Sequence, residues 1–239
     1  MRDTLLFDLD GTLVPFVQDD FIAAYFRSLV ECIAPMGYDG KQVVAGLWQG
    51  ISAMQKNNTA YLNHDVFWDA FAQTMGEQAR RLESVLDNFY TGAFHAVRAT
   101  LREERDLSAL MAQLRQKGYT LILATNPMFP AVAVEARMSW VGLKHSDFDY
   151  VTTYDNSTRC KPDPAYFLEI LEKLGKKPEQ CFMVGNNPEE DGAAIAAGIE
   201  TRILTDYLEN GNHCSLEGFS LCSFAEMCEE LLALPPVNA

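Results

Sequence analysis

The run Thr4-Leu5-Leu6-Phe7-Asp8-Leu9-Asp10-Gly11-Thr12 is the most informative stretch of this sequence. Its apolar stretch stops at Asp8, which is the pattern of a buried strand that ends in polar chemistry. A carboxylate at the end of a buried strand is costly unless a cation or hydrogen bonds compensate it. Asp8 and Asp10 point the same way in an extended segment, and Gly11 lets the backbone bend close to a ligand. We therefore expect a functional site at this strand end.

The second half of the chain alternates helices with strands. Apolar strands are predicted over residues 119–124, 148–153, 181–184 and 200–204. Helices are predicted between them and after them, over 107–117, from Pro130, over 163–174, up to about Gly198, and over 224–232. This alternation is typical of an α/β fold in which a parallel sheet carries helices on both faces.

Residues 15–103 show a different pattern, in which apolar side chains recur every three or four residues. This periodicity predicts an all-helical insert, with turns at Pro35-Met36-Gly37 and Asn57-Asn58. The insert leaves the chain directly after the first strand, so it should lie above the carboxyl ends of the strands, where ligands bind in such sheets. We therefore predict a catalytic core made of residues 1–14 and 104–239, with the insert as a second domain.

Composition restricts the function. The chain has 239 residues with a net charge of −14, and a surface this acidic repels nucleic acid and anionic membranes. The six cysteines form no C-x-x-C pair and no zinc-like cluster, which favours a reducing, cytoplasmic environment. We expect a monomer or homodimer that binds neither nucleic acid nor membrane. A phosphorylated substrate would need cations gathered at the site.

Two further strand ends carry polar residues that suit phosphate. Thr125 and Asn126 follow the strand 119–124, where a hydroxyl and backbone N–H groups could hold phosphate oxygens. Threonine also ends many strands without any such role. Lys161 precedes a proline that restricts its backbone, which suits a cation that reaches inward to a carboxylate or phosphate. The alternative is a solvated lysine in a turn.

The last strand end is the run Gly185-Asn186-Asn187-Pro188-Glu189-Glu190-Asp191. Helix capping explains much of it, because Asn187 suits an N-cap position, Pro188 the first helical position and Glu190 a capping box. Capping explains Asp191 less well and leaves Asn186 without a reason.

Together these motifs resemble those of the haloacid dehalogenase-like superfamily of phosphohydrolases. The resemblance covers nearly the whole chain, with all four motifs in order, and the D-x-D-G-T run at Asp8 is the specific one. It implies a Rossmann-like catalytic core, and it implies that the helical insert is a mobile cap.

The resemblance also implies roles for the site residues. Asp8 would be the nucleophile that forms an aspartyl-phosphate, and Asp10 the general acid and then the base. Lys161 would be a catalytic and substrate-binding cation that steadies Asp8 and the phosphoryl group. The remaining substrate-binding residues would be Thr12, Thr125 and Asn126. The implied reaction is hydrolysis of a small phosphorylated metabolite.

The fourth motif departs from the family pattern. The position that usually holds a metal-binding aspartate is Asn186, while Asp191 matches the second acidic position. The implied cofactor is Mg²⁺, held by Asp8, the Asp10 carbonyl, Asn186 and Asp191. An amide oxygen is a neutral and weaker ligand than a carboxylate, so we expect a softer metal site.

Four other functions share parts of this pattern, three within the family and one that is not enzymatic. A dehalogenase needs no metal and typically lacks the second aspartate of the first motif, whereas Asp10 is present. A phosphonatase would use a lysine of the cap, for which Lys41 and Lys56 have no distinguishing context. A phosphomutase shares the chemistry of Asp8. A weakened, non-enzymatic protein that only binds a phosphate ligand is the reading that Asn186 favours.

Overall fold

A computed structural model of the chain describes residues 2–237, apart from the side chains of residues 77 and 78. The strands form one parallel sheet and are β1 (Thr4–Phe7), β2 (Thr120–Leu123), β3 (Tyr150–Val151), β4 (Cys181–Gly185), β5 (Glu200–Leu204) and β6 (Ser220–Cys222). Their order across the sheet is β3-β2-β1-β4-β5-β6, so the chain reverses its direction of winding between β1 and β4. Ligands of open α/β sheets bind at such a reversal.

The register of the central strands brings their ends to one edge. Phe7 at the end of β1 pairs with Leu123 of β2 on one side and with Val184 of β4 on the other. The backbone N–H of Asp8 still donates to the carbonyl of Val184, at 2.9 Å. Residues that follow these three strands must therefore meet.

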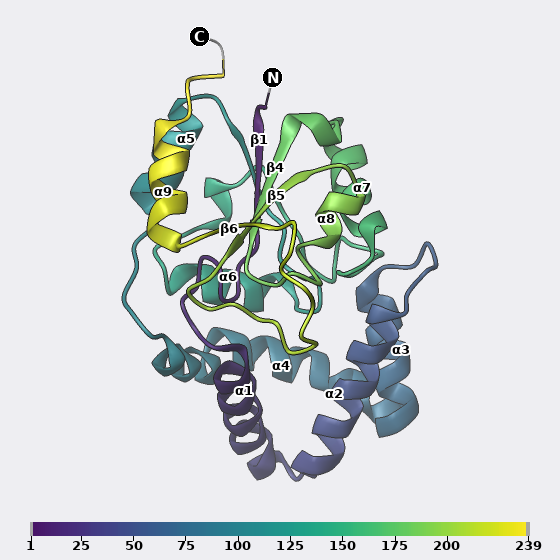
Figure 1. The fold of residues 1–239 in the computed structure, drawn as a ribbon. Helices are drawn as coiled ribbons and strands as arrows, with labels where there is room; N and C mark the ends of the chain where they lie inside the picture. The colour runs from purple at the N-terminus through teal and green to yellow at the C-terminus, as the bar shows by residue number, and fades with distance from the viewer. Residues whose placement is uncertain (1, 238–239) are drawn as a thin grey trace.

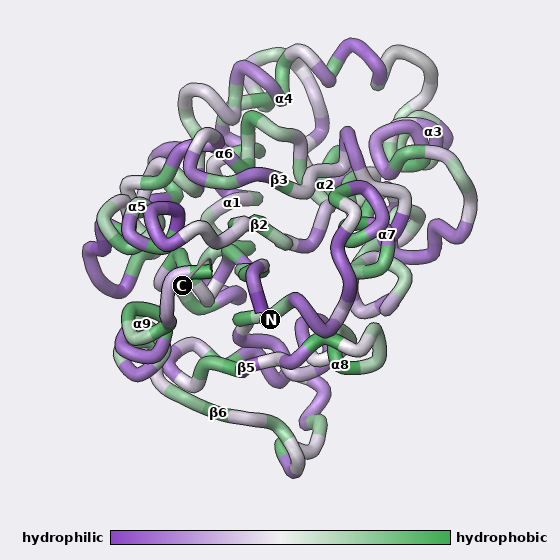
Figure 2. Tube along the Cα trace, turned by 90° about the horizontal axis from the view of Figure 1, so that it is seen from above, coloured by the Kyte–Doolittle hydropathy of each residue, from purple (hydrophilic) through white to green (hydrophobic). Residues whose placement is uncertain are grey.

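Helices cover both faces of the sheet, as the two sides of Figure 1 show. They are α5 (Ser108–Gln116), α6 (Ala131–Ser139) and α9 (Phe224–Ala233) on one face, and α7 (Pro164–Leu174) and α8 (Ala193–Ala196) on the other. Alternation along β1 decides the assignment, because Leu5 and Phe7 pack with the first group whereas Leu6 packs with the second. In the view along the strands, α5 and α9 lie opposite α7 and α8 (Figure 2).

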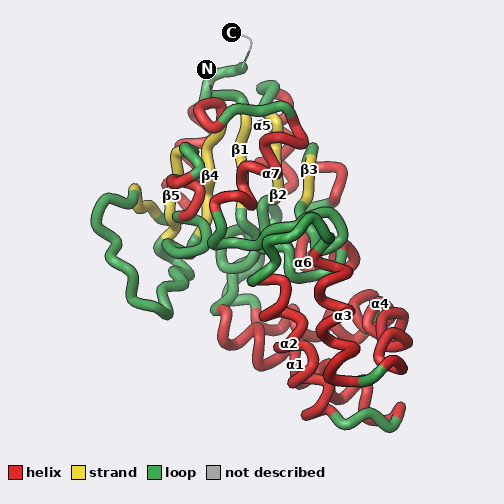
Figure 3. Tube along the Cα trace, turned by 90° about the vertical axis from the view of Figure 1, so that its right-hand side faces the viewer, coloured by secondary structure: helices red, strands yellow, loops and turns green. Residues whose placement is uncertain are grey.

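The helical insert lies beyond the carboxyl ends of the strands (Figure 3). Its α-helices are α1 (Gln18–Ile33), α2 (Gly40–Gln55), α3 (Asn63–Met75) and α4 (Leu82–Thr91). Short 3-10 segments complete it, at Ala34–Met36, Glu77–Arg81 and Ala93–Thr100, and two others lie in the core, at His145–Asp147 and Pro178–Gln180. Its buried face is aromatic and continues the core of the first sheet face, through Phe16, Phe21 and Phe94.

The structure confirms the predicted α/β class and the helical nature of the insert, and it adjusts three elements. Strand β6 was not predicted, because Ser220-Leu221-Cys222 is short and half-exposed. The strand predicted over 148–153 is reduced to Tyr150–Val151, and the helix predicted before Gly198 is reduced to Ala193–Ala196. Among the described residues, no helix combines the length and the apolar character needed to cross a membrane.

Candidate active site

The site forms at the ends of β1, β2 and β4. A cavity of about 40 Å³ there is lined by Asp8, Asp10, Gln18, Thr125, Asn126, Asn186, Asn187, Glu190, Asp191 and Glu209. Most of the residues predicted from the sequence therefore share one cavity. Gln18 belongs to α1, so the helical insert contributes to the wall.

Lys161 is a cation behind the cavity, where it contacts two of the carboxylates that line it. It is fully enclosed, and its ammonium group donates to Oδ1 of Asp8 at 2.9 Å and to Oδ1 of Asp191 at 2.6 Å. A buried ammonium between two carboxylates stays charged, and the pKa of Lys161 is raised by both of them against the effect of burial. Lys161 is therefore an internal cation rather than a solvated one.

The carboxyl group of Asp8 is in an unfavourable environment for its charge. Burial raises its pKa to about 7, Lys161 opposes this, and the nearby Asp191 and Asp10 add to it. The pKa of Asp10 is likewise raised by burial, against the charges of Arg137 and Lys161. Both groups would be relieved by an additional cation in the cavity.

The carboxylate of Asp191 holds the backbone of the fourth motif in place. Its Oδ2 accepts the backbone N–H groups of Asn186 and Asn187, each at 2.9 Å, while Oδ1 faces Lys161. A Cβ on Gly185 would lie 2.1 Å from this carboxylate, so only glycine permits the approach. Both oxygens of Asp191 are thus occupied by groups of the chain.

The side chain of Asn186 is also held from both ends. Its Oδ1 accepts the hydroxyl of Thr12 at 3.1 Å, and its Nδ2 donates to the carbonyl of Tyr207 at 2.7 Å. Gly11, at φ 75°, makes room for it, because a Cβ there would lie 2.2 Å from Nδ2. Thr12 is fully buried, so the structure places its hydroxyl on Asn186 rather than on the cavity.

Thr125 and Asn126 are set by contacts with neighbouring elements. The carbonyl of Thr125 accepts the hydroxyls of Thr152 and Tyr166, at 2.7 and 2.8 Å. Asn126 donates from Nδ2 to the carbonyl of Lys161 at 3.4 Å, which joins the second strand end to the lysine loop. Both residues line the cavity.

The site also contains two glutamates, Glu190 and Glu209, which were not predicted from the sequence to belong to it. Glu190 was interpreted as a capping residue, and its backbone N–H does bond to Oδ1 of Asn187, yet its side chain also lines the cavity. Burial raises its pKa to about 8. Glu209 lies in the loop after β5, and its backbone N–H donates to the carbonyl of Asn186 at 3.0 Å. Its position after a strand end was the signal that could have found it.

The chemistry of the donor set fits a hard divalent cation. The cavity gathers carboxylate and amide oxygens, which are the ligands that Mg²⁺ takes. Five carboxyl groups line the cavity, namely Asp8, Asp10, Asp191, Glu190 and Glu209, and two buried cations behind it, Lys161 and Arg137, pair with three of them. As they stand, the described side chains form no group of three acidic, histidine or cysteine ligands around one point. Backbone and amide oxygens would therefore have to complete a metal site.

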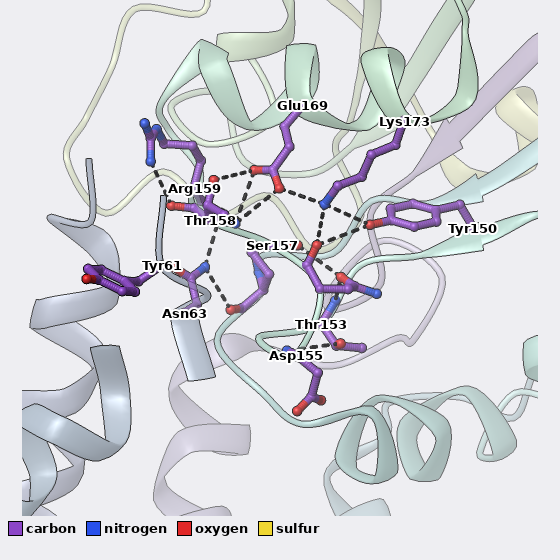
Figure 4. Close-up of polar contacts among 12 residues, drawn as sticks. Tyr61, Asn63, Tyr150, Thr153, Asp155, Ser157, Thr158, Arg159, Glu169 and Lys173 are labelled. Carbon is purple, nitrogen blue, oxygen red and sulfur yellow. Dashed lines mark hydrogen bonds and ion pairs between the residues drawn. The ribbon is translucent and has the colours of Figure 1, made fainter. Parts of the chain in front are cut away.

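The helical insert is fastened to the loop that carries Lys161. The buried side chain of Asn63 donates to the carbonyl of Arg159 at 3.2 Å, and its backbone N–H donates to the carbonyl of Ser157 at 2.9 Å (Figure 4). Arg159 in turn donates to the carbonyl of Thr59 at 2.6 Å. Glu169 of α7 holds the same loop by accepting from Thr158. We name these contacts between residues 57–63 and 157–160 the insert latch.

A family model described as haloacid dehalogenase-like hydrolase matches residues 2–198. The chain belongs to this family of hydrolases. A phosphoglycolate phosphatase from Pseudomonas putida is 30% identical over 240 residues, which cover 97% of this chain and 78% of that protein. One from Aliivibrio fischeri is 29% identical over 212 residues, covering 88% and 87%. The structure of the L-2-haloacid dehalogenase from Xanthobacter autotrophicus matches with a TM-score of 0.57 at 16% identity, covering 98% and 100%.

The match to the family model confirms the predicted family, and the similarity to the solved structure confirms the predicted fold. The structure also shows a residue near the site that no motif indicated. Arg137 of α6 is fully buried, with its Nε 3.3 Å from Oδ1 of Asp10. Its spacing from Ala133 and Val134 placed it on the buried face of α6, so a charged residue in an apolar stripe was the available signal.

Proposed function

We propose that this hydrolase is a phosphatase that cleaves small phosphate monoesters through an aspartyl-phosphate on Asp8. The observation that carries the proposal is the placement of Asp8. Its carboxylate is held by Lys161 at 2.9 Å and lines one cavity with Asp10, Thr125 and Asn126. A fixed carboxylate beside a buried cation suits attack on a phosphorus atom, because the cation also offsets the charge that gathers on the transferring group.

In the first step, a carboxylate oxygen of Asp8 attacks phosphorus and the ester P–O bond breaks. Asp10 gives its proton to the leaving oxygen, so the alcohol departs neutral. The raised pKa of Asp10 supports this role, because burial favours its protonated form. Lys161 and the backbone at Thr125 and Asn126 would hold the phosphoryl oxygens.

In the second step, water attacks the phosphorus of the aspartyl-phosphate. Asp10, now deprotonated, takes the proton from the water, the bond between Asp8 and phosphorus breaks, and inorganic phosphate leaves. Asp8 regains its carboxylate and Asp10 its proton. Two easier displacements thus replace one difficult hydrolysis.

Mg²⁺ is the proposed cofactor, and it would supply positive charge to the phosphoryl oxygens and to Asp8. We propose as its ligands the Asp8 carboxylate, the Asp10 carbonyl and the Asn186 amide oxygen, which accepts only one hydrogen bond. Because Asp191 is occupied by Lys161 and two backbone N–H groups, we propose that it supports the site from behind. Glu209 and Glu190 are the remaining carboxylates of the cavity wall.

A small substrate is supported by the confined site and by the relatives. The cavity beside Asp8 is small, and the helical insert, which we propose to act as a cap on a core of residues 1–14 and 104–239, covers that end of the sheet. Two relatives carry the name phosphoglycolate phosphatase, which supports a small phosphorylated metabolite as the substrate. The presence of Asp10 favours this reaction over dehalogenation.

The direct test is turnover of p-nitrophenyl phosphate and of phosphoglycolate with and without Mg²⁺. We expect the wild type to release phosphate only with the cation, and the Asp8→Asn variant to lose at least about 10³-fold in kcat. Equal turnover by wild type and Asp8→Asn would exclude Asp8 as the nucleophile. Turnover of 2-chloropropionate instead of the phosphate esters would favour a dehalogenase.

A further inference from the structure

Arg137 is buried without the partners that a guanidinium group normally has. It is 0% exposed, and none of its three guanidinium nitrogens has a hydrogen-bond partner among the described residues. Its guanidinium carbon lies 4.2 Å from the ring centre of Phe129 and 5.7 Å from that of Phe21. The aromatic faces partly replace the lost water, because they attract a cation.

The ion pair of Arg137 joins Nε to Oδ1 of Asp10, at 3.3 Å, and is its one such contact in the described part of the chain. An arginine cannot lose its charge in a protein, so its burial costs several kcal/mol unless a counter-charge offsets it. Replacing such a residue by an apolar one of similar size is often neutral or stabilising. Packing alone therefore does not account for an arginine at position 137.

Arg137 faces one of the two carboxylate oxygens of Asp10. The oxygen that faces Arg137, Oδ1, is fully enclosed, whereas the Asp10 side chain as a whole keeps 16% exposure and lines the cavity. The exposure of Asp10 therefore belongs to its other atoms. Arg137 itself is not part of the cavity wall, and among the described residues it meets the site through Asp10.

We propose that Arg137 is a positioning residue for Asp10, holding Oδ1 so that Oδ2 faces the leaving oxygen of the substrate. The inference rests on the proposed function, because it gives Asp10 the role of general acid. Placement of an acid within hydrogen-bond reach of the leaving oxygen determines how much it contributes. In this arrangement the carboxyl group of Asp10 contacts the substrate, and the buried guanidinium group of Arg137 sets the orientation of that carboxyl group.

The leaving group provides the test. An alkyl ester such as phosphoglycolate needs its leaving oxygen protonated, whereas p-nitrophenyl phosphate leaves well without a proton. We expect Arg137→Met to lower kcat/KM at least about tenfold for phosphoglycolate and less than about threefold for p-nitrophenyl phosphate. Arg137→Lys keeps the charge but not the planar group, and should recover part of the loss. A loss that is equal for both esters would overturn the proposal.

A cycle with Asp10 shows whether Arg137 acts through it. In the Asp10→Asn background, Arg137→Met should change kcat/KM for either ester by less than about twofold. A further loss as large as in the wild-type background would contradict the proposal. The melting temperature adds a readout independent of turnover. Asp10→Asn leaves a buried charge uncompensated and should lower Tm, and Arg137→Met should raise it again in that background.

Arg202→Met is the matched control. Arg202 lies on β5, half-buried and paired with Glu230 at 2.6 Å, and it is not part of the cavity wall. Its replacement should leave the ratio of kcat/KM for the two esters unchanged, and a shifted ratio would mean that the ratio does not report on Asp10. If Arg137→Met fails to fold, the ratio measured on Arg137→Lys decides. Failure of the proposed function is distinguishable, because it would appear as full activity in Asp8→Asn.

Discussion

At the scale of single residues, Asn186 is the position where this chain departs from its family's usual pattern. Each end of its amide makes one contact, with the oxygen accepting from Thr12 and the nitrogen donating to the carbonyl of Tyr207. An aspartate could accept the first contact but could not donate the second. Asn186, which follows β4, therefore ties that strand end to the loop that follows β5, as an aspartate could not.

This arrangement predicts opposite effects of Asn186→Asp with and without Mg²⁺. In EDTA the new carboxylate faces the Tyr207 carbonyl, which now lies 2.7 Å from the amide nitrogen, and unfolding should become easier by about 1–3 kcal/mol. With Mg²⁺ the variant should recover, and calorimetric titration should show tighter binding than in wild type. Asn58→Asp, which adds the same charge at an exposed position, should do neither. Unchanged affinity in Asn186→Asp would remove this residue from the proposed metal site.

The sequence allowed prediction of those site residues that stand at strand ends in a family motif. Asp8, Thr125, Asn126, Asn186 and Asp191 all line the predicted cavity, and their roles remain proposals. Arg137 and Glu209 escaped prediction for a physical reason. Their contacts with the site are made across the sheet edge by a helix and a loop, and a motif records only neighbours in sequence.

At the scale of elements, the insert latch connects the helix α3 with the lysine loop. Besides the carbonyl of Arg159, the amide of Asn63 donates to Cys160, and its oxygen accepts from Asn57. The position of Lys161 thus depends on a contact with the helical insert. The backbone carbonyl of Asn57, in the turn before α3, also accepts from Arg159, at 3.5 Å.

We expect Asn63→Ala to lower both stability and turnover. The substitution leaves buried acceptors of the lysine loop without a donor, which costs about 1–3 kcal/mol in the free energy of unfolding. Freed motion of Lys161 should reduce kcat for p-nitrophenyl phosphate about tenfold. Urea unfolding and steady-state kinetics measure the two effects. Asn58→Ala is the control, because the side chain of Asn58 is exposed and the substitution keeps the backbone carbonyl that accepts from Arg159. Equal behaviour of the two variants would show that the Asn63 side chain has no role in the latch.

The elements themselves were predicted where local signals are strong. Asp163 and Pro164 begin α7 and Gly175 ends it in the left-handed region, as cap residues should. Strand β6 was not predicted, and α8 is shorter than the helix predicted before Gly198. Both are half-exposed and have little apolar periodicity, so tertiary contacts rather than local sequence determine them.

At the scale of the whole molecule, a net charge of −14 surrounds a site that already has more carboxyl groups than cations. The balance at the site should control stability as a function of pH. Glu190 has its pKa raised to about 8 and Asp8 to about 7, so the folded protein holds protons that the unfolded chain has already released by about pH 5. Between about pH 5 and pH 8, folding is therefore accompanied by the uptake of protons.

Stability in EDTA should therefore fall as pH rises from about 5 to 8, and Mg²⁺ should restore it at the upper end. Glu190→Gln removes one of the titrating groups and should flatten the fall, being more stable than wild type by about 1 kcal/mol or more at pH 8, with the difference closing as the pH approaches about 4. Urea denaturation at fixed salt measures both. A stability that rises through this range in wild type would contradict the charge balance described for the site.

The central claim is that the phosphoryl group passes through Asp8, and trapping the intermediate tests it most directly. The Asp10→Asn variant, which lacks the base for the second step, is mixed with p-nitrophenyl phosphate and Mg²⁺, quenched in acid and reduced with borohydride. Reduction converts an aspartyl-phosphate to homoserine, which peptide mass spectrometry locates. We expect homoserine at position 8 and at no other aspartate. Burst release of p-nitrophenol with Asp8 unmodified would contradict it.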